Sequence, residues 1–99
     1  MLAAVVLEFS GELWWWRGPA PFHFVTVPEG ESAQLGDAAG LVTYGWGMVP
    51  VEALIGSTRW RTSLWPKDGA YVLPVKTAVR QAEGLKLGDV VPVRLTVDV

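Results

Sequence analysis

The amino-acid sequence predicts a mostly β fold, a small closed or partly open β-barrel of about six strands with two short helices. Short stretches in which apolar and polar residues alternate recur along the chain, and turns rich in glycine or proline separate them. Apolar residues make up 51% of the chain and charged residues 18%, which is typical of a chain with a packed core. Because so many apolar strands would expose their edges in an open sheet, closure into a barrel is favoured. The 99 residues are enough for one such domain, spanning residues 1–99.

Two strands are expected in the N-terminal third. Val5, Leu7 and Phe9 alternate with their neighbours in the period-2 pattern of a strand buried on one side. Glu8 interrupts the apolar run and no basic leader precedes it, so this start is expected to be a strand rather than a targeting segment. Residues 13–16 continue the strand, residues 17–21 break it with a glycine and two prolines, and residues 22–27 form the next strand.

Two helices are expected. The first runs from Pro28 to Ala39, where a proline precedes early acidic residues and a weak apolar stripe follows at Ala33, Leu35 and Ala38. The second begins at Pro74, because proline suits the first helical position, and Gly84 ends it. Its apolar residues recur at the spacing of one buried stripe, namely Val75, Ala78, Val79 and Ala82.

The central hairpin has the clearest pattern. A strand from Met48 to Ile55 is followed by Gly56-Ser57, a glycine-first pair suited to a two-residue type II′ turn. This turn fixes the register and brings the apolar residues of both strands to one side. The predicted opposing pairs are Ile55 with Thr58, Ala53 with Trp60, Val51 with Thr62, and, on the other side, Glu52 with Arg61.

Two further strands complete the predicted barrel. Residues 66–69, Pro-Lys-Asp-Gly, predict a turn before a short strand at residues 71–73. Gly88-Asp89 predicts another turn, and apolar residues alternate with polar ones from Val91 to Val99 in the last strand. Pro92 cannot donate a ladder hydrogen bond, so this end of the strand is expected to be an edge or a bulge.

Composition excludes several classes of function. The formal charge is −2 and the isoelectric point is about 5.2, so the chain has no general attraction for nucleic acid or anionic lipid. No apolar stretch approaches the roughly 20 residues that span a bilayer. Cysteine is absent, which excludes disulfides and thiolate chemistry and fits the reducing cytoplasm. Neither a phosphate-binding glycine loop nor a metal-ligand cluster is present, and no cofactor is expected.

Catalysis receives little support from the sequence. Ser63 is a candidate nucleophile and His23, the single histidine, its candidate base, but no acid or nucleophile-elbow pattern accompanies them. The aspartates at positions 68 and 89 fall in turns, where aspartate is favoured for structural reasons. An enzyme of unknown class is therefore only the third alternative.

Tryptophans and a few cations are the strongest candidates for a binding site. Six tryptophans are unusual in 99 residues, and three are consecutive, with Trp15 facing opposite to its two neighbours. Large aromatic surface of this kind is either buried in the core or left for a partner or a ligand. Arg59 and Arg61 share one face of the hairpin and could hold an anion, but a cross-strand pair of Glu52 with Arg61 offers a structural explanation instead. The residues expected to bind a ligand are Trp46, Arg61, Trp65, Lys76 and Arg80.

Two motifs carry a resemblance to a known family. A W-x-T-S-L-aromatic-P run spans residues 60–66, and an L-P-V-K-x-A-V-R run spans residues 73–80. With ELWWWRGPAPFHFVTVP upstream, these motifs resemble the bacterial and archaeal domain-of-unknown-function family DUF1905. The resemblance implies a small β-barrel and brings no activity or catalytic residues. A shorter similarity over residues 73–89 is to the swapped-hairpin barrels of transition-state-regulator and antitoxin proteins, and shared function does not follow from it.

The sequence thus favours a non-catalytic small-barrel binding module for a small anionic or aromatic ligand or a protein partner. We expect a homodimer, because residues 14–16 and the Pro92 strand end leave surface that a partner would cover. The alternative is a dimeric DNA-binding or antitoxin-like regulator. The placement of the cations discriminates between the two, because a regulator needs them on one exposed surface and a ligand module needs some of them in a cavity. The cations concerned are Arg59, Arg61, Lys76, Arg80 and Arg94.

Overall fold

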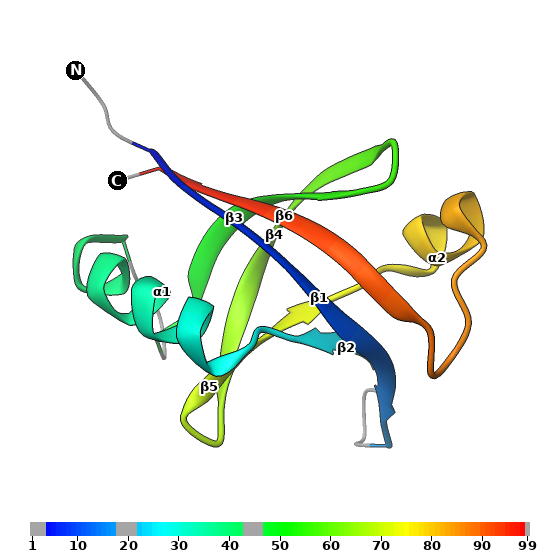
Figure 1. Cartoon of the computed structure of the whole chain (residues 1–99), viewed down its shortest axis with the longest axis horizontal. Helices are drawn as coiled ribbons and strands as arrows, with labels where there is room; N and C mark the ends of the chain where they lie inside the picture. The colour runs from blue at the N-terminus through cyan, green and yellow to red at the C-terminus, as the bar shows by residue number, and fades with distance from the viewer. Residues whose placement is uncertain (1–3, 18–21, 43–46, 99) are drawn as a thin grey trace.

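The computed structural model describes residues 4–17, 22–42 and 47–98. Six antiparallel strands form a closed barrel in the order β1-β2-β5-β4-β3-β6, as predicted. The strands are β1 (Ala4–Trp16), β2 (Phe22–Thr26), β3 (Val49–Ile55), β4 (Thr58–Lys67), β5 (Ala70–Pro74) and β6 (Val90–Asp98). Helices α1 (Glu29–Val42) and α2 (Thr77–Glu83) lie at opposite ends of the barrel, as Figure 1 shows.

Strand β1 closes the barrel by changing partner along its length. Residues 4–12 pair with β6, and residues 13–16 pair with β2. The change of partner follows Gly11, where an added Cβ would lie 2.7 Å from Val25 Cγ1 and 2.9 Å from the carbonyl oxygen of Thr26. A residue without a side chain therefore lets the two strands cross closely at this corner.

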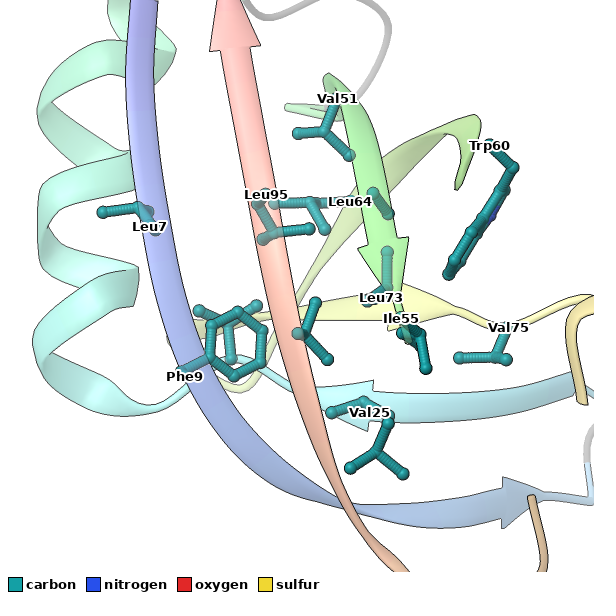
Figure 2. Close-up of a cluster of buried hydrophobic side chains, with 14 of the residues drawn as sticks. Leu7, Phe9, Val25, Val51, Ile55, Trp60, Leu64, Leu73, Val75 and Leu95 are labelled. Carbon is teal, nitrogen blue, oxygen red and sulfur yellow. The ribbon is translucent and has the colours of Figure 1, made fainter. Parts of the chain in front are cut away.

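The core fills the barrel interior with the alternating residues of its strands. Val49, Val51, Ala53 and Ile55 are all buried, as the period-2 pattern predicts. Figure 2 shows side chains from several strands converging on this interior, including Trp60, which the sequence also places in the core. The predicted alternation of β6 holds as well, with Val91, Val93, Leu95 and Val97 buried.

The central hairpin has the predicted register. Ile55 lies opposite Thr58, Glu52 opposite Arg61 and Ala53 opposite Trp60. Gly56 has φ 58°, the positive value required of the first turn residue. The pairing of β3 with β6 stops at Arg94, so on its β3 side Pro92 has no partner strand among the residues that the structure describes. This agrees with the predicted strand edge.

Three sequence predictions need correction. The turn after β4 consists of Asp68 and Gly69, with φ 51° and 80°, and Pro66 belongs to the strand. Two successive residues with positive φ make a type I′ hairpin turn, which matches the strand twist better than a longer proline turn.

The first helix is the second correction. Helix α1 runs on to Val42, and Ala33 of its predicted stripe is exposed, while Leu35 is buried together with Ser32.

The start of the second helix is the third correction. Pro74 ends β5, and α2 begins at Thr77. The backbone N–H of Val75 donates to the carbonyl of His23 at 2.8 Å, so Val75 still extends the sheet. Val75 and Val79 are buried as predicted, but the stripe does not include Ala78 and Ala82, which are exposed. Gly84 ends α2 in the left-handed conformation with φ 64°, as expected.

Within the described residues, no helix is long and apolar enough to cross a membrane.

Candidate functional site

A cavity of about 480 Å³ opens where β5 leaves the sheet and the chain enters α2. Its walls come from β1, β2, β4, the end of β5 and α2. The lining residues are Trp15, Phe22, His23, Thr62, Trp65, Pro74, Val75, Lys76, Thr77 and Arg80. The volume lies within the range of small-molecule sites in proteins.

Hydrogen bonds hold helix α2 in a position where Arg80 and the N-cap residue Lys76 line this cavity. Gly84 closes its last turn by donating to the carbonyl of Gln81, and Leu85 donates to that of Arg80 at 2.9 Å. The Glu83 carboxylate accepts hydrogen bonds from the Thr58 and Ser57 hydroxyls, which joins the helix to the turn between β3 and β4. The β3-β4 turn therefore holds the C-terminal end of α2. The hydrogen bond from the Val75 N–H to the His23 carbonyl holds the chain just before the helix.

Aromatic rings form one side of the cavity. Trp15 follows Leu13 on the side of β1 that faces inward, and lies across from His23 in the strand register. The Trp15 and His23 rings stack with centroids 6.5 Å apart and planes at 27°. Phe22 meets Trp65 edge to face at 5.0 Å, and the buried Phe24 meets the same indole at 5.2 Å. The indole of Trp65 is thus packed against Phe22 and Phe24, and it also lines the cavity.

Two cations of the cavity have no acidic partner. No carboxylate among the described residues forms an ion pair with Lys76 or Arg80. Arg80 donates from Nη2 to the Thr77 hydroxyl at 3.0 Å, while its Nε is buried without a hydrogen-bond partner in the described part of the chain. A guanidinium that is partly removed from water and under-satisfied gains from an anion placed beside it.

The positive charge of Arg80 acts on the imidazole of His23. Burial, and secondarily the positive charge of Arg80, lower its pKa below the usual 6.5. His23 is therefore mostly uncharged at neutral pH, and Lys76 and Arg80 are the main positive charges that line the cavity.

The site unites three of the five residues predicted to bind a ligand. Trp65, Lys76 and Arg80 all line the cavity. Arg61 instead lines a neighbouring hollow of about 250 Å³, and Thr62 borders both spaces. Trp46 lies outside the described residues. Of the pair considered for catalysis, His23 lines the cavity and Ser63 is not among the lining residues.

Sequence reasoning missed several residues of the cavity as binding candidates. The sequence marks Trp15 as one of three consecutive tryptophans and His23 as a candidate base, and it assigns neither to the binding site. A sequence signal existed in principle, because a hairpin linking the strands at residues 13–16 and 22–25 brings one residue of each strand to face the other. The structure realises this in the pairing of Trp15 with His23.

A second hollow of about 480 Å³ lies over β1, β3 and β6. Its charged residues, Glu8 and Arg94, bind each other, with 2.7 Å between Glu8 Oε1 and Arg94 Nη2. Both side chains are largely exposed. No group of three or more metal-ligating side chains occurs among the residues the structure describes. The cavity beside α2 is therefore the stronger candidate site.

Comparison with known proteins gives a family but no activity. Residues 9–95 match the family model described as "Domain of unknown function (DUF1905)". No curated protein matches the chain. Because the family model covers most of its length, the chain belongs to DUF1905.

Proposed function

We propose that this member of DUF1905 is a non-catalytic binding module whose cavity beside α2 takes a small anionic ligand with a flat aromatic part. The proposal rests on one observation. Lys76 and Arg80, two cations without an acidic partner among the described residues, line a cavity with aromatic walls. We further place this module in the cytoplasm of a bacterium, in keeping with its lack of cysteine.

The charges of the chain support an anion in this cavity. Arg59 pairs with Glu52 at 3.4 Å, and Arg94 pairs with Glu8. These cations are explained by their partners. Lys76 and Arg80 have no such explanation among the described residues, and no acidic side chain lines their cavity. An anionic group would therefore enter a site that holds only positive and neutral side chains.

The aromatic walls support a flat ligand. Trp65 is held by Phe22 and Phe24, so its indole is a rigid surface for stacking. Trp15 remains 42% exposed although it lies on the inward-facing side of its strand, which leaves ring surface for a ligand. Offset stacking and edge-to-face contacts add about 0.5–1.5 kcal/mol per ring pair beyond the burial of area.

The rival function, DNA binding, finds less support. A regulator would gather its cations on one surface, but two of the five are paired with carboxylates on the β1-β6-β3 side and two others line the cavity. The remaining one, Arg61, lines a separate hollow. We therefore infer that the chain does not bind duplex DNA tightly.

We also propose that the chain forms a homodimer. Trp16, which does not line the cavity, is exposed to 40%, and a second copy would cover it. Sedimentation across micromolar concentrations tests this, and a single species of 10.8 kDa throughout would refute it.

The ligand proposal is tested with simple probes and matched variants. Benzoate and benzenesulfonate carry a ring and an anion, benzamide carries the ring without the charge, and acetate carries the charge without the ring. Binding is followed by the indole N–H signals in NMR spectra and by thermal shift. We expect both aromatic anions to bind more tightly than benzamide or acetate.

Substitution of Arg80 decides whether the cations carry the binding. Because a hydrogen bond to a charged group contributes about 1.5–3 kcal/mol, Arg80→Ala should weaken benzoate binding by roughly ten- to hundred-fold. Arg59→Ala removes a cation that is paired elsewhere and should leave the affinity within about twofold. Equal affinity for all variants, or no binding of either aromatic anion at about 10 mM, would refute the proposed function.

A further inference from the structure

His23 lies among the groups that would surround the ligand. From α2 and its N-cap, Arg80 and Lys76 face the same cavity. From β1, Trp15 stacks on the imidazole, and just beyond the strand the Arg17 guanidinium lies 5.5 Å from the centroid of that indole. From β4, the cavity receives Thr62 and Trp65, neither of which titrates in the accessible range. Every charge that the described residues present to this space is therefore positive.

The surroundings of His23 disfavour a second proton on its ring. The ring is partly removed from water, and Arg80 repels a further positive charge, so both causes lower its pKa. The nearest acidic residue on α2, Glu83, is engaged by Thr58 and Ser57 of the hairpin turn. In the free protein, nothing lining the cavity offers a charged imidazole a negative partner.

We propose that His23 is a third binding residue for the anion, and that it takes up a proton as the anion enters the cavity. This inference rests on the proposed function of the same site. An anion beside Arg80 cancels the repulsion that the guanidinium exerts on the imidazole and adds an attraction of its own. The imidazolium then gains the partner that the free cavity lacks. The proton comes from the solvent, and no bond within the ligand changes.

Linkage gives the direction of the effect. If the bound protein holds its imidazole proton more tightly than the free protein does, the affinity for the anion rises as the pH falls through the titration of His23. Each unit by which the anion raises the pKa of His23 increases the affinity at low pH about tenfold relative to high pH. A histidine that merely packs against Trp15 would produce no such increase.

The experiment uses the intact chain and the fact that it contains one histidine. The imidazole C–H signal in a proton NMR titration is then free of overlap from other histidines. Benzenesulfonate is the probe, because a sulfonate stays ionised throughout the range and any pH dependence belongs to the protein. We expect the free protein to titrate below pH 6.5, and saturating benzenesulfonate to move the titration upward by about one unit or more.

Two variants keep the result interpretable. Arg80→Ala should raise the titration of His23 in the free protein and reduce the upward movement caused by benzenesulfonate. His23→Gln should remove the difference between the affinities measured at about pH 5.5 and about pH 8, whereas Arg59→Ala should retain it. The ratio of the two affinities is the readout, so a general weakening of binding does not imitate the effect.

The outcomes separate this inference from the proposed function. If benzenesulfonate shifts the indole signals but leaves the titration of His23 in place, the inference is overturned and the proposed function stands. If the variant His23→Gln keeps the full pH dependence, the proton is taken up elsewhere and the inference is again overturned. If neither benzenesulfonate nor benzoate binds, both fall together.

Discussion

The two walls of the barrel differ in the residues on their outer faces. The wall made by β1, β6 and β3 buries its inner residues and turns charged pairs such as Glu8 with Arg94 to the outside. The wall made by β2, β5 and β4 is buried on part of its outer face as well, where Phe24 and Val72 are only 2% exposed, although neither belongs to the interior core. Trp14 and Trp65 cover them there. The candidate site lies at the end of this second wall, where apolar surface and unpaired charge occur together.

The largest expected effect comes from truncating the outer aromatic cluster. Phe24→Ala should lower the free energy of unfolding by about 3–5 kcal/mol, because it removes a buried ring that contacts three other aromatic residues. Ser10→Ala, on the outer face of the other wall, should change it by less than about 0.5 kcal/mol. Denaturant unfolding measures both. Similar costs for the two substitutions would show that the walls do not differ.

A smaller effect is expected where the hairpin meets α2. Gly56→Ala forces a side chain into a positive φ and places a Cβ against the Glu83 carboxylate, so we expect a loss of about 1–3 kcal/mol. Because Glu83 fastens α2, the same substitution should also weaken benzoate binding. Gly30→Ala is the matched control, since its added methyl meets nothing and lies in helix α1. Loss of stability with unchanged binding would show that the hairpin does not position Arg80.

The smallest effects concern the cations themselves. A double-mutant cycle on Glu8 and Arg94 should give a coupling of about 0.2–1 kcal/mol, the usual range for an exposed pair. Arg80→Ala should cost less than about 0.5 kcal/mol of stability, because among the described residues the guanidinium bonds only the Thr77 hydroxyl. A loss of more than about 2 kcal/mol for Arg80→Ala would instead indicate a structural role.

Local patterns were sufficient to predict most of the barrel. The register of the central hairpin followed from one glycine-first turn, because a two-residue turn leaves no freedom of pairing. The start of α2 was misjudged, because Pro74 suits both a helix and the end of a strand. Only a tertiary bond, from the N–H of Val75 to the carbonyl of His23, makes the residues before Thr77 part of the sheet.

The site was predicted only in part for a related reason. Lys76 and Arg80 are four residues apart, so their proximity could be expected from sequence. The placement of His23 and Arg80 at the same cavity depends instead on the path that the chain takes between β5 and α2. Arg61 was expected at the same place, but its strand position directs it to the neighbouring hollow.

The pairing of β1 with β6 also sets how the chain folds. Ala4 lies opposite Asp98 and Glu12 opposite Val90, so closing the barrel joins strands from the two ends of the sequence, which Figure 1 shows side by side. Contacts of such wide sequence separation carry a large entropic cost before they are rewarded, and proteins dominated by them fold in milliseconds to seconds. Until β6 has been synthesised, residues 4–12 of β1 lack the strand with which they pair in the barrel. This unpaired edge is then open to association with other chains.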